Sequence, residues 1–358
     1  QAEGVGYSQM TRKGRFRGST AQTFLKQAKK RLNLRVETNA TVSKLIFEDK
    51  KCVGVKFFKH GKEKFIKAAK EVILSGGAVN SPHILQVSGI GPSDHLINIG
   101  INVVHHLPGV GANLQDHYVA RVSHRVRHAK SINSLSRGTN LLKEIATWAF
   151  SGKGALTFGV TSAMVFSRSR EGLSSPDLQL LFTPASYSER TLGKLEQEDG
   201  MTVAVCPVRP ASRGTIMAVS SDPFVRPEIR PNYLSDPDDV RVLLAGIHQT
   251  REIFSQPALQ RYSSKETAPG IQIQTSEELE SFARENGSII YHPVSTCRMG
   301  DDAMAVVDPR LRVHGIKGLR VVDASIMPTV TTGNTNAPTI MIAEKASDMI
   351  LEDARQAS

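Results

Sequence analysis

Cysteine is scarce in this chain, and the three that occur, Cys52, Cys206 and Cys297, lie far apart with no Cys-x-x-Cys among them. Three thiols cannot all pair within one chain, so we expect neither a disulfide framework nor a cysteine-based zinc site. No His-Glu-x-x-His or comparable cluster occurs, so no metal site is predicted. Gly-x-Ser-x-Gly is also missing, and serine hydrolase chemistry therefore has no support in the sequence.

Long apolar runs are lacking as well. No uninterrupted apolar stretch approaches 18 residues, so no membrane-spanning helix is expected. The first residues, Gln1-Ala2-Glu3-Gly4, contain neither an initiator Met nor a signal peptide, which suggests that the chain is part of something longer. Two glycosylation sequons, Asn39-Ala40-Thr41 and Asn286-Gly287-Ser288, have meaning only in a secreted protein, so secretion is weakly favoured and the location stays open.

Acidic residues are outnumbered: 45 Lys and Arg face 34 Asp and Glu, a formal net charge of +11 over 358 residues. The basic residues cluster within 12–17, 26–31 and 59–70, but aromatic residues do not interleave with them as in a nucleic-acid-binding motif. We therefore expect a solvated basic surface and no nucleic-acid partner, with weak attraction to anionic surfaces as the alternative. The length allows one large core or two modest ones.

Hydrophobic periodicity predicts a chain of mixed helices and strands. Apolar positions spaced by three and four residues predict helices over 20–32, 93–100, 141–150, 236–254, 276–283 and 338–351. Short β-like runs fall at 34–37, 42–47, 52–58, 64–67, 72–74, 118–126, 163–166, 178–182, 201–207, 215–220 and 319–322. The first four of these runs indicate an antiparallel meander. The strands between 118 and 220 suggest an α+β domain built on an antiparallel sheet.

The run Val72-Ile73-Leu74 leads into Ser75-Gly76-Gly77-Ala78 and then into a helix expected to carry Pro82 in its first turn. Glycines let backbone approach a ligand closely, and free N–H groups at a helix start favour a phosphate. A tight turn that merely needs glycine would explain the same residues. The strand–glycine–helix unit is therefore a candidate ligand site with an equally good structural explanation.

Two polar segments near the C-terminus each follow or precede a rigid element. His292 stands beside Pro293, which restricts both residues. About forty residues later comes Gly333-Asn334-Thr335-Asn336, just before the last predicted helix, and between them a strand stops at Asp323-Ala324-Ser325. A histidine can accept a proton near neutral pH and an asparagine can donate a hydrogen bond. Taken alone, His292 would more often be a satisfied histidine in a turn.

The segments together resemble a known family. Tyr-His-Pro-x-x-Thr-Cys-Arg-Met-Gly at 291–300, Leu-Arg-Val-Val-Asp-Ala-Ser at 319–325 and Gly-Asn-Thr-Asn-Ala-Pro-Thr at 333–339 resemble the C-terminal signature of the glucose-methanol-choline (GMC) oxidoreductases. A second signature fits at 77–82, 88–92 and 107–111. The resemblance covers nearly the whole chain, is strongest to the insect glucose dehydrogenase (FAD, quinone)-like branch, and identifies the chain as the C-terminal portion of such a protein.

The resemblance implies an FAD-binding body of the FAD/NAD(P)-binding-domain type joined to an antiparallel-sheet substrate domain, a mixed α/β and α+β fold. In this picture residues 1–113 are the remainder of the FAD-binding domain, 114–290 form the substrate domain, and 291–358 return to the FAD-binding domain with the catalytic motif. The family's N-terminal βαβ unit should carry Gly-x-Gly-x-x-Gly, which occurs nowhere in this chain.

The resemblance also assigns site residues. It makes His292 the base that takes the alcohol proton while hydride passes to FAD, and Asn334 the residue that orients the substrate oxygen, with Asn336 as the alternative. The expected flavin contacts are Val42 at the adenine, Asp323 and Ala324 near the ribityl and pyrophosphate, and, against the isoalloxazine ring, Tyr291, His292, Asn334, Thr335 and Asn336.

The predicted function is oxidation of a CH–OH group in a small alcohol or sugar, with quinone or oxygen as the open choice of electron acceptor. Two alternatives stay open: a non-redox lyase that keeps FAD structurally, and an inactive family fragment with a structural or binding role. The absent dinucleotide motif favours incomplete activity for the chain as it stands. Flavin bleaching on addition of substrate would distinguish the alcohol-oxidising enzyme from the non-redox lyase.

Overall fold

The computed structural model describes residues 3–188 and 193–356, which divide into two compact units. Unit 1 holds the described residues up to 36, together with 118–208 and 237–289. Unit 2 holds 37–117, 209–236 and the described residues from 290 onward. The domain division expected from the sequence placed the first 36 residues, residues 114–117 and residues 209–236 differently.

Two sets of contacts between residues distant in sequence explain the placement of the first 36 residues and of residues 209–236. The first strand, β1 (Gly4–Tyr7), pairs antiparallel with β11 (Ala163–Ser167) and so extends the sheet of unit 1. The hairpin of β14 (Thr215–Met217) and β15 (Glu228–Arg230) is held in unit 2 by Gln86, whose amide donates to the carbonyl of Ile216 at 3.0 Å and accepts from the N–H of Ala218 at 2.6 Å. Neither pairing leaves a trace in hydrophobic periodicity.

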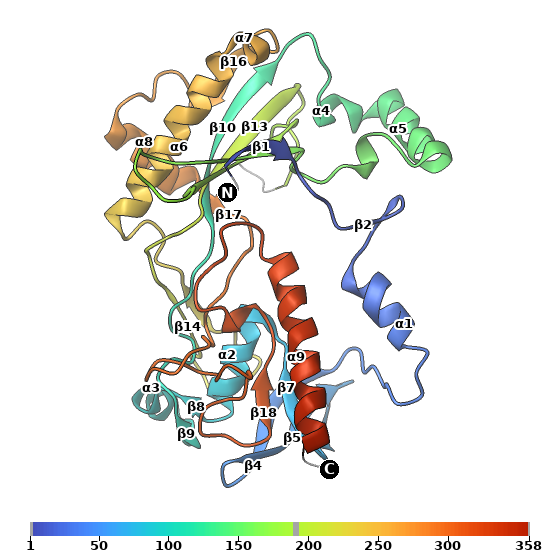
Figure 1. Ribbon diagram of the computed structural model, residues 1–358, viewed down its shortest axis with the longest axis vertical. Coiled ribbons are helices and arrows are strands. Elements are labelled where there is room, and N and C mark those ends of the chain that lie inside the picture. The colour runs from blue at the N-terminus through green and yellow to red at the C-terminus, as the bar shows by residue number, and fades with distance from the viewer. Residues whose placement is uncertain (1–2, 189–192, 357–358) are drawn as a thin grey trace. The chain divides into compact units, whose positions relative to one another are not determined.

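Unit 1 is built on an antiparallel sheet, the architecture expected from the middle of the chain (Figure 1). The strand order is β1-β11-β12-β13-β10-β16, with β17 also paired to β10. The remaining strand bounds are β12 (Leu178–Thr183), β13 (Gly200–Pro207), β10 (Tyr118–Val126), β16 (Ser263–Ala268) and β17 (Ser288–Ile289). The predicted runs at 118–126, 163–166, 178–182 and 201–207 are confirmed as strands of this sheet. Apolar side chains of β10, β12 and β13 are buried in it, whereas those of β11 are half-buried.

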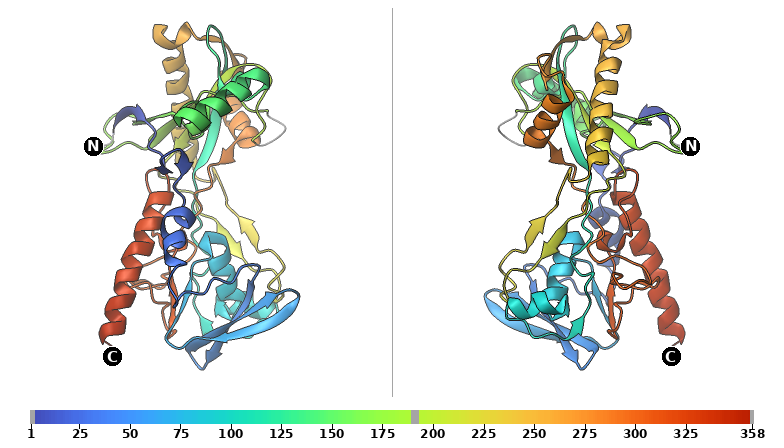
Figure 2. Two further views of the ribbon diagram at one scale, coloured as in Figure 1. Left: turned by 90° about the vertical axis from the view of Figure 1, so that its right-hand side faces the viewer. Right: turned by 90° about the vertical axis from the view of Figure 1, so that its left-hand side faces the viewer.

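Helix α6 (Pro237–Ser255) packs on this sheet against β13, β10 and β12, and Figure 2 shows it running along the sheet. Its first turn carries Asp238 and Asp239 near the positive end of the helix dipole, as predicted. Gly246 faces the sheet, and a Cβ there would lie 2.4 Å from a methyl carbon of Val205. The helix can approach the sheet this closely only because that position has no side chain.

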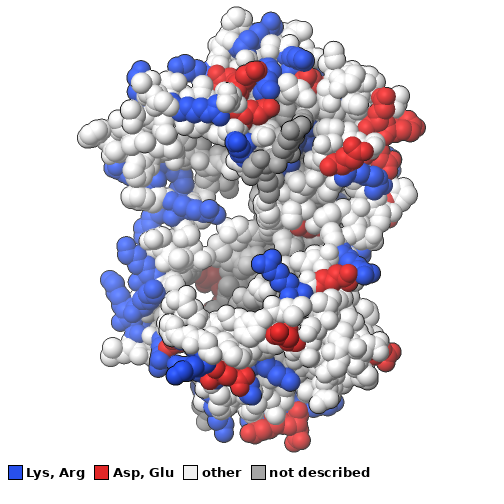
Figure 3. All heavy atoms as spheres, turned by 180° about the vertical axis from the view of Figure 1, so that it is seen from behind, with Lys and Arg blue, Asp and Glu red and all other residues white. Residues whose placement is uncertain are grey.

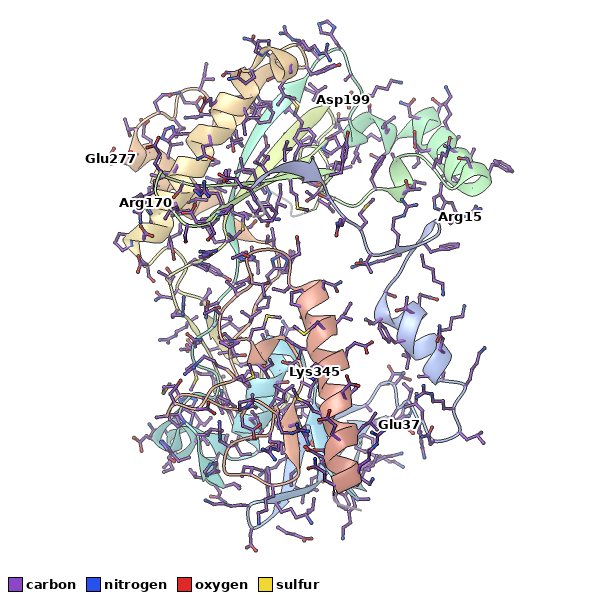
Figure 4. All side chains as sticks on the ribbon, viewed as in Figure 1. Arg15, Glu37, Arg170, Asp199, Glu277 and Lys345 are labelled. Carbon is purple, nitrogen blue, oxygen red and sulfur yellow. The ribbon has the colours of Figure 1, made fainter. Side chains whose placement is uncertain are left out.

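Unit 1 also contains α4 (Ile132–Leu135), α5 (Gly138–Ser151), α7 (Pro257–Gln260), α8 (Ser276–Asn286) and the 3₁₀ turn η2 (Ala155–Thr157). Of these, α7 contacts β16 and α8 contacts β10. Helices predicted over 141–150, 236–254 and 276–283 are thereby confirmed. The short hairpin of β2 (Arg12–Lys13) and β3 (Phe16–Arg17) contacts α5, where the Arg15 guanidinium, labelled in Figure 4, donates to the carbonyl of Ala149.

The helix predicted over 20–32 is wrong in extent. The structure has a single π turn, η1 (Ala21–Leu25), followed by α1 (Lys26–Ala28), and no residue of either is buried. The strand predicted at 34–37 is not formed. Short helices depend on packing of an apolar face, and here Phe24 stays 51% exposed, so nothing extends the helix beyond its first turns.

Unit 2 contains the predicted meander of β4 (Thr41–Glu48), β5 (Lys51–Lys59) and β6 (Lys62–Lys67), all antiparallel. Beside it, β7 (Val72–Leu74) and β18 (Leu319–Val321) form a parallel pair. Two further strands, β8 (Ile90–Gly91) and β9 (His105–His106), are also parallel. One apolar core joins these elements, with Leu45, Leu74, Leu85 and Val321 among its buried side chains.

Helices α2 (Gly77–Val87), α3 (Ser93–Asn98) and α9 (Asn336–Gln356) complete unit 2, with the 3₁₀ turn η3 (Ala324–Ile326). Figures 1 and 2 show α9 beside β18 and β7, and only Ala346 of its 21 residues is buried. Lys345, labelled in Figure 4, lies on its exposed side. The helices predicted over 93–100 and 338–351 are confirmed, and the C-terminal one begins earlier than expected.

Pro82 lies at the sixth residue of α2 instead of in its first turn, which corrects the prediction. A proline there cannot donate the N–H that the carbonyl of Ala78 would otherwise accept. The hydroxyl of Thr296 replaces that donor and lies 2.6 Å from the Ala78 oxygen. The Thr of the C-terminal motif thus repairs a hydrogen bond that the proline of the earlier motif removes.

Charge and hydropathy agree with the sequence expectations. Lys and Arg side chains are spread over the surface and interspersed with Asp and Glu on the face drawn in Figure 3. Within residues 3–188 and 193–356, none of the helices has the length and apolar content needed to span a bilayer. Cys52, Cys206 and Cys297 are buried thiols outside any disulfide bond. The sequon asparagines Asn39 and Asn286 are exposed, and secretion stays a prediction.

Candidate functional site

Asp116 lies at the centre of a polar group in unit 2 that joins three segments distant in sequence. One oxygen of its carboxylate accepts the backbone N–H of His117 at 2.7 Å and that of His292 at 2.8 Å. The other accepts the hydroxyl of Tyr233 at 3.3 Å. Burial raises the pKa of Asp116, while the two N–H donors act in the opposite direction. A single carboxylate therefore fixes the backbone on both sides of the site.

Ser295 is held by a second set of hydrogen bonds in the same group. The Asn113 amide donates to the Ser295 hydroxyl at 2.7 Å, and that hydroxyl donates to the carbonyl of Pro328 at 3.1 Å. Gln115 contributes a longer bond to the same hydroxyl, at 3.4 Å, and accepts the N–H of Val330. The residues around His292 are thus bound both to the segment before β10 and to the loop that precedes α9.

Backbone strain is concentrated in this group. Three of the ten described non-glycine residues with positive φ belong to it: Asn113 at 61°, Tyr291 at 62° and Ser295 at 78°. Such conformations cost free energy and persist only where the surroundings enforce them, and they gather at functional sites. Here the enforcing contacts are the hydrogen bonds of Asp116 and Ser295. The strain supports a functional reading of the group.

His292 is buried, with 7% of its surface exposed, and both ring nitrogens have partners. Its Nδ1 lies 2.9 Å from Nδ1 of His117, and the two rings meet edge to face at 5.1 Å between centroids. Its Nε2 lies 3.2 Å from the side-chain nitrogen of Asn334. Burial lowers the pKa of His292 to about 4, so the imidazole is neutral at physiological pH and able to accept a proton.

Asp323 organises a turn elsewhere in unit 2, at the C-terminal ends of the parallel strands. Its carboxylate accepts the Gly77 N–H at 2.9 Å, the Ser81 hydroxyl at 2.6 Å and the Ser325 N–H at 2.8 Å. Gly77 has φ of +78°, and a Cβ at that residue would meet no atom within 4 Å. The turn after β7 and the turn after β18 are therefore bound together beside open space.

The other residues predicted for the site have varied positions. Tyr291 is 67% exposed beside the buried His292. Thr335 is buried, and Asn336 is exposed at the first residue of α9. Ala324 opens η3, and its carbonyl accepts the N–H of Ser295 at 3.4 Å. Val42 lies in β4 opposite Phe57.

Of the two asparagines considered for the place beside His292, the structure brings Asn334 there. Sequence reasoning missed Asp116, His117 and Tyr233, because none of them stands in a segment that carries the family resemblance. The available signal was the unbroken polar series Gln115-Asp116-His117 directly before a strand. Among the described residues, no group of three or more His, Cys, Asp or Glu side chains could hold a metal ion.

Comparison with known proteins finds matching family models and relatives that align over nearly the whole chain. The family models described as GMC oxidoreductase match residues 1–119 and 210–343. The oxygen-dependent choline dehydrogenase of Pectobacterium carotovorum is 44% identical over 352 residues, 98% of this chain and 63% of that protein. The alcohol dehydrogenase [acceptor] of Pseudomonas putida is 41% identical over 362 residues, 99% of this chain and 65% of that protein.

A solved structure agrees with this relationship. A formate oxidase variant of Aspergillus oryzae RIB40, studied for FAD modification, superposes with a TM-score of 0.93 at 25% identity, covering all of this chain and 67% of the other. The chain spans about 63% of the length of the choline dehydrogenase it matches. The mixed fold with an antiparallel-sheet domain, expected from the sequence, is thereby confirmed. The glucose dehydrogenase-like branch stays a prediction.

Proposed function

The chain belongs to the GMC oxidoreductase family, and from that premise we propose that the full-length protein oxidises the CH–OH group of a small alcohol with FAD as hydride acceptor. The observation that carries the proposal is His292, a buried neutral imidazole whose Nε2 faces the amide of Asn334. A base with this protonation state and a neighbouring donor are what alcohol oxidation asks of a protein.

The donor set of unit 2 suits a flavin. Helix α9 begins two residues after Asn334 and has no acidic residue in its first turn, so its positive end favours an electron-rich ring edge. The open space at Gly77 leaves room for a ligand beside the Asp323 turn. In this proposal Asp323 and Ala324 lie near the ribityl and pyrophosphate, Val42 lies near the adenine, and the ring is contacted by Tyr291, His292, Asn334, Thr335 and Asn336.

The reaction then assigns a role to each side chain. FAD, when bound, supplies the acceptor for the hydride that leaves the carbinol carbon. His292 takes the hydroxyl proton at Nε2, so the alcohol becomes a carbonyl and the proton stays on the imidazole. Asn334 donates to the substrate oxygen or to Nε2, but cannot accept the proton itself. Asp323 acts through the turn it shapes, since its carboxylate oxygens already accept three donors of the chain.

Choline is the first substrate to test, because the Pectobacterium relative is named as a choline dehydrogenase. The Pseudomonas relative is named as an alcohol dehydrogenase, so simple primary alcohols form the second set. Both are small CH–OH compounds. Oxygen and a quinone are the two acceptors to compare for the reoxidation of the protein.

The test is anaerobic stopped-flow bleaching of the flavin in the full-length, FAD-loaded protein. His292→Ala should slow bleaching by roughly 10²- to 10⁴-fold, the usual contribution of a positioned general base, and leave FAD bound. His83→Ala is the matched control, since His83 is also a buried histidine of unit 2. If His292→Ala bleaches as fast as the unsubstituted protein, the base is another group. If no alcohol bleaches the unsubstituted protein, the proposed function itself fails.

A further inference from the structure

His117 is the one fully buried histidine of the group, and its role follows from a rule about paired imidazoles. A neutral imidazole carries one proton, so one of its nitrogens donates and the other accepts. Where two neutral rings meet nitrogen to nitrogen, one must donate and the other accept. The 2.9 Å contact between Nδ1 of His117 and Nδ1 of His292 therefore couples the tautomers of the two rings.

The partner at the other nitrogen of His292 decides the direction. The Asn334 amide nitrogen faces Nε2 at 3.2 Å, and an amide N–H can only donate. Nε2 must then present its lone pair, and the proton of the neutral ring lies on Nδ1, where it donates to Nδ1 of His117. In the opposite arrangement Nε2 would carry the proton, and the lone pair of His292 would point at a buried ring.

We propose that His117 is a positioning residue that keeps the proton of His292 on Nδ1 and so leaves Nε2 unprotonated, as a base requires. The inference rests on the proposed alcohol oxidation for its meaning, although the tautomer itself can be measured without it. Asp116 supports the arrangement, since one of its oxygens accepts the backbone N–H of both histidines and so holds the two rings in their edge-to-face contact.

His117 also acts after proton uptake. Once Nε2 of His292 has taken the alcohol proton, the ring is positively charged, and its Nδ1–H makes a charge-assisted bond to His117. Asp116 and His117 are the titratable residues among the hydrogen-bond partners of His292, and Tyr233 reaches the group through Asp116. A hydrogen bond that is stronger in the charged state lowers the barrier to forming that state.

Nitrogen-15 NMR of the full-length, FAD-loaded protein with labelled histidine tests the tautomer directly, because protonated and unprotonated ring nitrogens resonate in separate ranges. The two rings are assigned from the signals lost in His292→Gln and His117→Gln. At neutral pH we expect a protonated Nδ1 and an unprotonated Nε2 on His292. A protonated Nε2 on His292 would overturn the proposal, whether or not the protein oxidises an alcohol.

Kinetics give a second, independent test. His117→Phe should slow flavin reduction at saturating alcohol by about 10- to 100-fold, as loss of a histidine's outer hydrogen-bond partner does at metal sites, while KM changes less than threefold. His117→Asn, whose Oδ1 hangs from Cγ as Nδ1 does, should recover part of the rate. His83→Phe controls for the loss of a buried imidazole. A His117→Phe protein that remains folded and reduces flavin at the unsubstituted rate would refute the positioning role.

Discussion

Replacing Asp323 by Asn should destabilise unit 2 specifically. The two side chains have nearly the same shape, but the carboxylate accepts hydrogen bonds at both oxygens, whereas an amide accepts at one end and donates at the other. All three partners of Asp323, the N–H of Gly77, the hydroxyl of Ser81 and the N–H of Ser325, donate to it. Whichever way the amide turns, its NH₂ group faces at least one of these donors.

The magnitude follows from the bonds lost. The least costly orientation keeps the amide oxygen toward Gly77 and Ser81 and leaves the Ser325 N–H without an acceptor, which costs roughly 1–3 kcal/mol in a buried setting. The two bonds that persist become neutral, and each loses about 1 kcal/mol relative to a bond with a charged acceptor. The expected loss is therefore about 3–5 kcal/mol, a large fraction of the 5–15 kcal/mol that folding usually yields.

The assay has to report unit 2. Trp148, the only tryptophan, lies in unit 1, so its fluorescence follows the wrong unit. Hydrogen exchange with mass spectrometry, on peptides covering 72–88 and 319–327, should show protection falling by roughly 100-fold or more, while a peptide over β12 in unit 1 keeps its protection. Asp348→Asn is the matched control, because Asp348 is an exposed residue of α9. If the peptides 72–88 and 319–327 are equally protected from exchange in Asp323→Asn and in Asp348→Asn, Asp323 does not bind the two turns together.

Two further predictions concern His292 and its neighbour Asn334. The pKa of His292 falls from 6.5 to about 4 in the folded protein because of burial, so the unfolded chain takes up a proton that the folded protein refuses. Stability should therefore decline as pH drops from about 6.5 to 4, by roughly 3 kcal/mol at 1.36 kcal/mol per unit. Urea unfolding across this range, compared with His292→Gln to cancel the opposite contribution of Asp116, measures it, and identical pH dependence in both proteins would contradict it. Asn334→Ala should slow flavin bleaching by roughly 10- to 100-fold, the 1.5–3 kcal/mol of one bond to a charged group, which is less than the loss in His292→Ala. Equal losses in the two variants would show that Asn334 does more than orient.

Local pattern was enough for most of the secondary structure. The strands of unit 1 and the meander of unit 2 follow from alternating apolar residues, and the late helices follow from spacing by three and four. Both signals arise within a few residues of each other along the chain, so they are legible without a fold. The same holds for the candidates His292, Asn334 and Asp323, which stand in the short sequence motifs that resemble the family signature.

Contacts between distant residues had to come from the tertiary structure. The pairing of β1 with β11 joins residues about 160 apart, and the acceptor for Ser81 and Gly77 is a carboxylate 242 and 246 residues away. The helix predicted over 20–32 failed for the complementary reason: its periodicity was real, but no core was there to receive its apolar face. Sequence periodicity can indicate such a helix, but most of its stability has to come from tertiary packing of its apolar face.

The sequence by itself pointed to His292 as the candidate base through the motif at 291–300, since a histidine beside a proline is by itself more often structural. Only the tertiary structure shows the surroundings that the proposed role requires. Burial lowers its pKa, Asn334 faces its Nε2, and His117, a residue that no motif of the sequence singled out, faces its Nδ1. Protonation and tautomer are properties of an environment, and that environment is assembled from three segments which the chain brings together only on folding.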